Sequence, residues 1–204
     1  MKYGFFFIKR HKLPLVIIVL SLVLVIFYLA GTTKPLGKTT PGLSQLGGDF
    51  ILDSASGSVS LLNYRQRVVI LYFGYLSCPK VCPASMSVLG RALNKLTPKE
   101  QAQVQGFFIS LDPQRDSFSK LARYTAQFHD NIIGLSGSPE TIADISEQYG
   151  VFYDRSNPTG VRMEYSVAHA SRFYIVDKQG KLVVAMNHTV TPNELAVQIR
   201  KFLF

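Results

Sequence analysis

Both cysteines of the chain lie in one short motif, and their spacing decides what chemistry they could perform. Cys78 and Cys82 stand in the proline-flanked segment FGYLSCPKVCP. Redox enzymes of the thioredoxin type use Cys-x-x-Cys, whereas three residues separate these two cysteines. At helical i, i+4 spacing the Cβ atoms are about 5–6 Å apart, and a disulfide requires roughly 3.8 Å. Two thiolates on one metal ion tolerate the wider spacing, so the motif favours a metal site and leaves a disulfide open.

A pair of thiolates is a soft ligand set that selects Cu(I) over hard cations. Such a pair would accept a third ligand, and histidine is the obvious type. Lys80, between the cysteines, and a helix N-terminus beside them would both lower the thiol pKa values. The chain has no second cysteine pair and no closely spaced histidine pair, which excludes a zinc finger. Two cysteines also cannot build a disulfide-rich scaffold.

The elements around the motif predict where these thiols lie. The apolar, β-branched and aromatic run 68–75 predicts a buried strand, and 83–95 predicts a helix with Pro83 in its first turn. Both thiols then lie at the C-terminal edge of a sheet. The other predicted elements are an opening hairpin over 49–61, strands at 104–110, 132–135, 172–176 and 181–185, and helices at 118–128, 138–149 and 191–204.

The order of these elements predicts an α/β, thioredoxin-like fold with an N-terminal β-hairpin. Alternating strands and helices give a parallel core, and the closing hairpin adds antiparallel edges. Ser138 and Thr191 are the expected N-caps of the last two helices, each followed by proline.

The N-terminal part predicts one transmembrane helix ahead of this domain. Residues 13–30 carry no charge, and 18 helical residues span roughly 27 Å, near the hydrocarbon thickness of a bilayer. The alternative is a cleaved signal peptide, but residues 28–33 make a poor cleavage site, which favours an uncleaved anchor. The basic residues of the 1–12 tail favour a cytoplasmic N-terminus. Residues 31–48, rich in Gly, Pro, Thr and Ser, predict a flexible linker. We therefore expect a single-pass protein of the bacterial inner membrane whose 49–204 domain lies in the periplasm.

The net charge of +9 comes mostly from this N-terminal part. Six of the 22 Lys and Arg precede Asp49, the first acidic residue, so 16 basic residues face 13 acidic ones in the remainder. This balance gives little support for a nucleic-acid-binding face, and no nucleic-acid partner is expected. Only 17% of the residues are charged and 12% are aromatic, which excludes a disordered, highly charged tail protein.

The motif resembles the metal-binding signature of the Sco/SenC family, membrane-anchored copper proteins of cytochrome c oxidase assembly. The resemblance continues through 110–117, 128–142 and 165–169 and covers about 49–204. It implies a thioredoxin-like domain that binds one copper ion per chain, as Cu(I), Cu(II) or both, through Cys78, Cys82 and His169. It also implies an upstream copper donor and delivery of copper, or of reducing equivalents, to the binuclear copper site of cytochrome c oxidase subunit II.

The position of His169 fits that role. It precedes the predicted strand 172–176, where thioredoxin-like reductases carry a cis-proline against the cysteines, and 160–190 contain no proline. Asp112 follows a buried strand at the same sheet edge and could orient the metal ligands through hydrogen bonds. The family commonly has Asp at two positions that here are Lys80 and Ala168. Losing two negative charges should disfavour Cu(II) relative to Cu(I).

Two other functions use the same thiols. A thiol-disulfide oxidoreductase would employ Cys78 and Cys82 as redox-active thiols that keep cysteines of the oxidase subunit, or of other periplasmic proteins, reduced. A peroxidase of the peroxiredoxin type is disfavoured, because Tyr75 and Ser77 occupy the local positions of its activating groups. A metal-binding assembly factor, rather than an enzyme that turns over substrate, is the favoured interpretation.

Overall fold

The computed structural model describes residues 12–31, 42, 45–151 and 171–204. The chain divides into two compact units, 1–40 and 41–204. The described part of the first is the helix α1 Lys12–Gly31, which covers the predicted 13–30 segment. Its described side chains, those of 17–28, are exposed and apolar apart from Ser21. Within the described residues, no helix combines the length and the apolarity that a membrane crossing requires.

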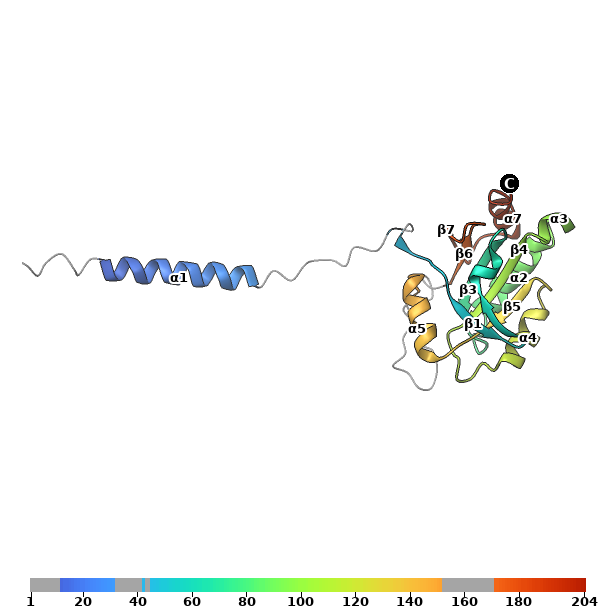
Figure 1. Cartoon of the computed structure of the whole chain (residues 1–204), viewed down its shortest axis with the longest axis horizontal. Helices are drawn as coiled ribbons and strands as arrows, with labels where there is room; N and C mark the ends of the chain where they lie inside the picture. Colours follow the sequence, from blue (N-terminus) through green and yellow to red (C-terminus); the bar gives the residue numbers. More distant parts are fainter. Residues whose placement is uncertain (1–11, 32–41, 43–44, 152–170) are drawn as a thin grey trace, which may run out of the picture. The chain divides into compact units, whose positions relative to one another are not determined.

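The second unit is built on a five-stranded sheet in the order β5-β4-β3-β6-β7 (Figure 1). The central strand β3 pairs in parallel with β4, and β4 pairs in parallel with β5. Strand β6 is antiparallel to β3, and β7 is antiparallel to β6. The parallel core is therefore confirmed. The bounds are β3 Val68–Gly74, β4 Val104–Ser110, β5 Ile132–Leu135, β6 Arg172–Val176 and β7 Leu182–Asn187.

The sequence predicted that the closing hairpin lies at the edge of the sheet, and this is only partly correct. Of the two hairpin strands only β7 lies at an edge of the sheet, because β6 pairs with the central strand β3 on its other side. The segment 172–176 is consequently buried at four of its five positions. The opening hairpin, β1 Ile51–Ser54 with β2 Gly57–Ser60, forms a separate two-stranded sheet. One bridge between Asp53 and Ser136 connects it to the loop after β5.

Helices and hairpin cover the two faces of the large sheet. The seven residues of β3 are all buried, and the first six alternate between two apolar clusters, as the period of a strand dictates. One cluster contains side chains of α5 and of the opening hairpin, and the other contains side chains of α2, α4 and α7. The helix bounds are α2 Val81–Leu93, α4 Phe118–Ala126, α5 Pro139–Gln148 and α7 Pro192–Arg200, with short helices η2 Leu61–Tyr64 and α3 Pro98–Gln101.

Side-chain caps mark the first residues of α5 and α7 but not of α2. The Ser138 side chain accepts a hydrogen bond from the Thr141 N–H, and Thr191 forms a capping box with Glu194, so both predicted caps are confirmed. The predicted start of α2 at Pro83 is wrong by two residues. The helix begins at Val81 after Lys80, which provides no side-chain cap. Cys82 therefore lies inside the first turn of α2 and Cys78 lies in the loop before it.

The end of β3 and the start of α2 approach each other closely at Gly74. A Cβ atom on Gly74 would stand 2.9 Å from the Cys82 Sγ and 2.9 Å from the Phe108 ring. Phe108 is fully buried on the neighbouring strand β4, so neither the ring nor the helix turn can move away freely. Glycine at this position is what lets the Cys82 sulfur rest against the sheet.

Gly74→Ala should therefore lower the free energy of unfolding by about 1–3 kcal/mol, because an added methyl overpacks a filled core. Denaturant unfolding followed by circular dichroism measures the loss. Gly106→Ala is the matched control, since the nearest atom to its Cβ would be a side-chain carbon at 3.2 Å, and it should cost less. Equal stabilities for the two variants would show that Gly74 is not the tight contact.

Candidate metal centre

The two thiols are in contact through the backbone of the first helical turn. Cys82 is buried, with 3% of its surface exposed, and Cys78 is half-buried in the preceding loop. The Cys82 N–H donates a hydrogen bond to the Cys78 Sγ at 3.4 Å. The Cys78 N–H in turn donates to the Tyr75 carbonyl at 3.2 Å, which closes a turn directly after β3. Both cysteines are free thiols. They lie at the carboxyl edge of the sheet, as predicted.

The pKa values of the two thiols are shifted in opposite directions. A hydrogen bond from the Cys82 thiol, assisted by backbone N–H groups of Cys82, Lys80 and Val81, lowers the pKa of Cys78 to about 5, although partial burial opposes this. The pKa of Cys82 is raised, because its proton is held by the Cys78 sulfur and because its side chain is buried. Near neutral pH the pair is therefore one thiolate and one thiol. A metal that binds both sulfurs must displace one proton.

The cause of the lowered pKa differs in part from the predicted one. The helix N-terminus contributes through its N–H groups, as expected. Lys80 acts through its backbone N–H, whereas the sequence suggested an effect of its ammonium group. Two tyrosines complete the surroundings. Burial raises the pKa of Tyr72, and burial together with the two cysteines raises the pKa of Tyr75 to about 12, so both phenols stay neutral near the thiolate.

A buried carboxylate that the sequence did not single out fixes the cysteine loop. Asp116 is 3% exposed, and its Oδ2 accepts hydrogen bonds from the Leu76 N–H at 3.0 Å and from the Ser110 hydroxyl at 2.7 Å. Burial raises the pKa of Asp116. One carboxylate thus joins the loop two residues before Cys78 to the last residue of β4. The only signal in the sequence was its place four residues after Asp112.

Asp112 lies beside Asp116 but has different partners. Its side chain is largely buried and accepts a hydrogen bond from the Arg115 Nε. Its carbonyl accepts hydrogen bonds from the N–H groups of Arg115 and Asp116 at 3.2 and 3.0 Å. Asp112 therefore shapes the turn that presents Asp116 to the cysteine loop. The predicted role of Asp112 in orienting the metal ligands stays a prediction.

The third predicted ligand, His169, lies outside the described residues. Across 45–151 and 171–204, no three of His, Cys, Asp and Glu gather closely enough to hold a metal ion. This part of the domain supplies the two sulfur ligands of the predicted set.

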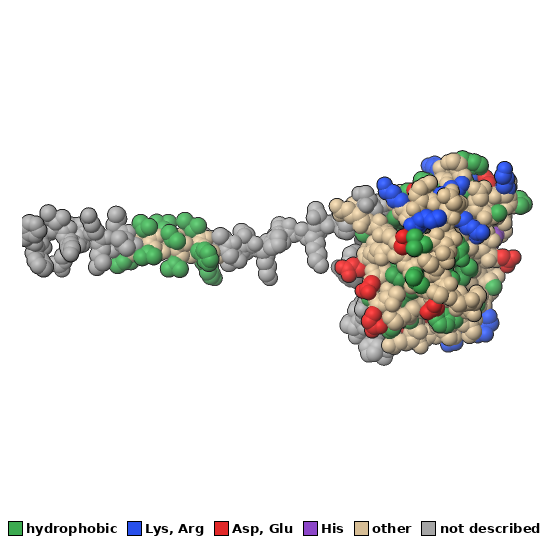
Figure 2. Space-filling view, in the orientation of Figure 1, with side chains coloured by type: hydrophobic (Ala, Val, Ile, Leu, Met, Phe, Trp, Pro, Cys, Tyr) green, Lys and Arg blue, Asp and Glu red, His purple; other side chains and the backbone are tan. Residues whose placement is uncertain are grey.

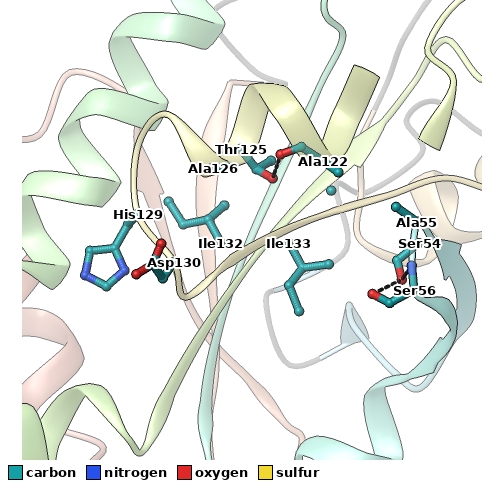
Figure 3. Close-up of a pocket in the computed structure, with 11 residues that line it drawn as sticks. Ser54, Ala55, Ser56, Ala122, Thr125, Ala126, His129, Asp130, Ile132 and Ile133 are labelled. Carbon is teal, nitrogen blue, oxygen red and sulfur yellow. Dashed lines mark hydrogen bonds between the residues drawn. The ribbon is translucent and has the colours of Figure 1, made fainter. Parts of the chain in front are cut away.

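A separate hollow lies between α4, β5 and the turn of the opening hairpin (Figure 3). Ser54 and Ser56 line one end of it, and His129 and Asp130 line the other. The His129 Nδ1 accepts a hydrogen bond from the Asn131 N–H at 3.0 Å, and burial lowers the pKa of this histidine. None of the residues that line this hollow belongs to the cysteine loop. His129 thus has a structural hydrogen-bond partner.

Comparison with known proteins identifies the family to which this fold and motif belong. The family model described as SCO1/SenC matches residues 38–203. The chain belongs to the SCO1/SenC family. Protein SCO1 of Saccharomyces cerevisiae, a mitochondrial protein, is 35% identical over 71% of this chain and 50% of its own length. The chain thus spans about half the length of the curated SCO1/SenC relatives that it matches first.

Solved structures agree with both the family and the fold. The copper-bound crystal structure of Arabidopsis thaliana ScoI is 30% identical, with a TM-score of 0.68 over 78% of this chain and 98% of that one. The thioredoxin domain of a thiol-disulfide oxidoreductase from Bacteroides vulgatus is only 15% identical but has a TM-score of 0.58 over 80% of this chain and 99% of that one. The domain therefore has the thioredoxin-like α/β fold that the order of elements predicted.

The unequal thiols should be visible in their rates of alkylation. In reduced, metal-free protein, the rate at which Cys78 reacts with iodoacetamide should rise with pH along a titration centred near 5, because the thiolate is the nucleophile. Cys82 should react slowly throughout, since it is protonated and buried. Cys82→Ala removes the S–H donor and should move the Cys78 titration upward toward 9. Peptide mass spectrometry follows both sites.

The lowered pKa of Cys78 also makes the folding stability depend on pH. The folded-state pKa of Cys78 lies below its ordinary value of 9.0, so the thiolate contributes its full stability above about pH 9. That contribution falls as the pH drops and is gone below about pH 5. A wild-type titration near 9, or one that Cys82→Ala leaves in place, would contradict the hydrogen-bonded pair.

Asp116 should act as a positioning residue for Cys78. Asp116→Ala leaves the Leu76 N–H and the Ser110 hydroxyl without their acceptor, which should cost about 1–3 kcal/mol of folding stability. The loosened loop should also raise the pKa of Cys78, measured by the same alkylation profile. Asp116→Asn retains an oxygen that can accept both bonds and should restore much of the profile. Asp130→Ala, which removes an exposed carboxylate away from the cysteine loop, is the control; an equal effect on Cys78 there would remove the special role of Asp116.

Proposed function

We propose that the chain is a copper metallochaperone that binds one copper ion through Cys78, Cys82 and His169. The observation that carries the proposal is the hydrogen-bonded thiolate–thiol pair at the carboxyl edge of the sheet, found in a chain of the SCO1/SenC family. Soft sulfur donors favour Cu(I), and one of the two is already ionised near neutral pH. Copper is here a cargo to be passed on, and the copper-bound relative supports this choice of metal.

The recipient that we propose is the binuclear copper site of cytochrome c oxidase subunit II. Proteins of the Sco family are cytochrome c oxidase assembly proteins, which supports a partner in that complex. The half-exposed Cys78 is the sulfur that a partner could reach first, while the buried Cys82 would release copper last. An upstream copper donor would load the site by the same route in reverse.

We also propose the membrane arrangement that the sequence predicted. The uncharged 13–30 run would anchor the chain in the bacterial inner membrane, with 1–12 in the cytoplasm. Residues 31–48 would tether the 49–204 copper-binding domain on the periplasmic side. A tether of this length would keep the domain close to membrane-bound partners.

Lys80 and Ala168 bear on the oxidation state of the cargo. The family commonly has Asp at both positions, so this chain lacks two carboxylates of the family pattern. A bis-thiolate Cu(I) site carries about one negative charge, which the Lys80 ammonium would attract. The site should therefore prefer Cu(I) to Cu(II).

The second candidate function, a thiol-disulfide oxidoreductase, is favoured by one specific observation. A thiolate of low pKa beside a protonated thiol is the arrangement that attacks and then resolves a disulfide. Reduction of a partner would form a mixed disulfide at Cys78, and attack by Cys82 would release the partner thiol. The chain would leave that cycle oxidised and would need an electron donor to return.

Copper binding by the full-length chain separates these functions. Reduced protein should bind about one Cu(I) per chain, measured by metal analysis after removal of excess metal. Outer groups around a metal site contribute about 10–100-fold in affinity, so loss of a direct ligand in Cys78→Ser, Cys82→Ser or His169→Ala should cost at least about 100-fold. His129→Ala is the matched control, because His129 has a structural partner, and it should bind normally.

Two outcomes would redirect the proposal. Full affinity in His169→Ala would remove the histidine from the ligand set. Catalytic reduction of a partner disulfide that survives both His169→Ala and copper chelation would establish the oxidoreductase instead.

A further inference from the structure

Basic side chains gather at the edge of the sheet opposite the cysteines. This is the amino edge, where β3 and β4 begin and β6 ends. Figure 2 shows a concentration of Lys and Arg over this end of the domain, near α7, α3 and the C-terminus. We call this surface the basic edge; its members are Arg65, Arg67, Lys95, Lys99, Lys178, Lys181, Arg200 and Lys201.

Hydrogen bonds between four chain segments make the basic edge one continuous surface. The Gln66 N–H donates to the Lys178 carbonyl at 3.0 Å, and the Lys178 ammonium donates to the Gln103 side chain at 2.9 Å and to the Leu203 carbonyl. Arg200 donates to the Lys95 carbonyl at 2.6 Å. Residues distant in the sequence are thus held side by side by hydrogen bonds to uncharged acceptors.

The basic edge carries a surplus of positive charge. Asp49, Glu100 and Asp177 are the acidic residues in its segments, against eight Lys and Arg. Asp49 pairs with Arg65 and Glu100 pairs with Arg200, both inside the surface. The other six cations have no carboxylate partner among the described residues. In the rest of the described domain six Lys and Arg face eight Asp and Glu, so the positive surplus of the described domain lies at this edge.

The N-terminal segment joins the domain at this same edge. Gly47 lies against Leu182, since a Cβ there would stand 2.7 Å from the Leu182 Cβ, and Leu182 follows the basic-edge residue Lys181. Asp49 holds Arg65 through both carboxylate oxygens, at 2.8 and 2.9 Å. The domain is therefore connected, through the segment before Gly47, to the proposed anchor from its basic side.

We propose that the basic edge binds the anionic phospholipid headgroups of the membrane in which the chain is anchored. The inference rests on the membrane anchoring put forward under Proposed function. A tether that enters at this edge keeps it near the bilayer, and exposed lysines near a surface of anionic lipids each contribute attraction without needing a shaped pocket. A nucleic acid would meet the same charges, but the point of chain entry favours the lipid surface.

Docking in this way would fix the orientation of the domain. The seven residues of β3 run from the basic edge to the cysteine loop, so lipid contact at one end turns the thiols away from the bilayer. Cys78 would then face partners that project from the membrane. A tethered domain without this contact would tumble, and its thiols would face the bilayer part of the time.

Tryptophan fluorescence can test the orientation, because the chain has no Trp. Phe204→Trp places a probe on a 95% exposed residue after α7, at the basic edge, and Phe118→Trp places one at the start of α4, at the opposite edge. The full chain is reconstituted into vesicles that contain headgroup spin-labelled lipid as quencher. With roughly one-third phosphatidylglycerol in phosphatidylcholine, the Phe204→Trp probe should be quenched strongly and the Phe118→Trp probe weakly.

Charge variants supply the matched control. Each lysine near an anionic surface contributes about fivefold to the docked population, so Lys99→Gln with Lys181→Gln should lower the docked-to-free ratio about 25-fold. Lys120→Gln with Arg123→Gln removes two charges from α4 and should leave the quenching unchanged. Pure phosphatidylcholine or about 1 M salt should abolish the difference between the two Trp probes.

The outcomes separate docking from anchoring. Equal quenching of both probes, or the same Phe204→Trp quenching in neutral and anionic vesicles, would overturn the docking proposal while the anchor stands. Salt-sensitive binding to anionic vesicles by a chain that leaves them in about 1 M salt would support the basic edge and refute the anchor. Tight binding of a short DNA duplex, without anionic-lipid quenching, would assign the surface to nucleic acid instead.

Discussion

The hydrogen bond from the Cys82 N–H to the Cys78 sulfur is the interaction on which the rest of the site depends. It exists because α2 begins at Val81, which puts Cys82 into the first turn with its N–H directed at the Cys78 sulfur. The absence of a Cβ on Gly74 lets Cys82 rest against the end of β3. Packing thus holds one sulfur rigid and protonated, and hydrogen bonds keep the other ionised and half-exposed. One turn of helix therefore creates two chemically different sulfurs from one residue type.

The loop that carries Cys78 is fixed from the opposite side by Asp116. A buried carboxylate is costly unless its oxygens accept hydrogen bonds, and Asp116 accepts them from the loop and from the end of β4. That cost is the reason the loop is well defined, because moving Leu76 away would leave a desolvated acid with fewer partners. The sulfur pair is consequently held to two adjacent strands of the sheet, through Gly74 on β3 and Ser110 on β4.

The sequence predicted the elements better than their arrangement. The apolar run at 68–75 and the caps Ser138 and Thr191 are local signals, and the structure confirms them. The insertion of β6 next to β3 was not predictable in the same way, because strand order depends on which faces are left to bury. The start of α2 was placed too late because proline suits the whole first turn and does not mark one position in it. Asp116 was missed because its partner Leu76 is 40 residues away.

The composition gives the net charge of the domain, but only the fold shows where that charge lies. A small surplus spread evenly would do little, but folding concentrates it at the amino edge, while the thiols lie at the carboxyl edge. The seven residues of β3 separate the two edges by roughly 20 Å, which exceeds the Debye length of about 8–10 Å in physiological salt. The basic edge therefore cannot be what ionises Cys78, and the low pKa must come from the N–H and S–H donors beside it. Surface attraction and thiol chemistry can consequently change independently, each through residues at its own edge of the sheet.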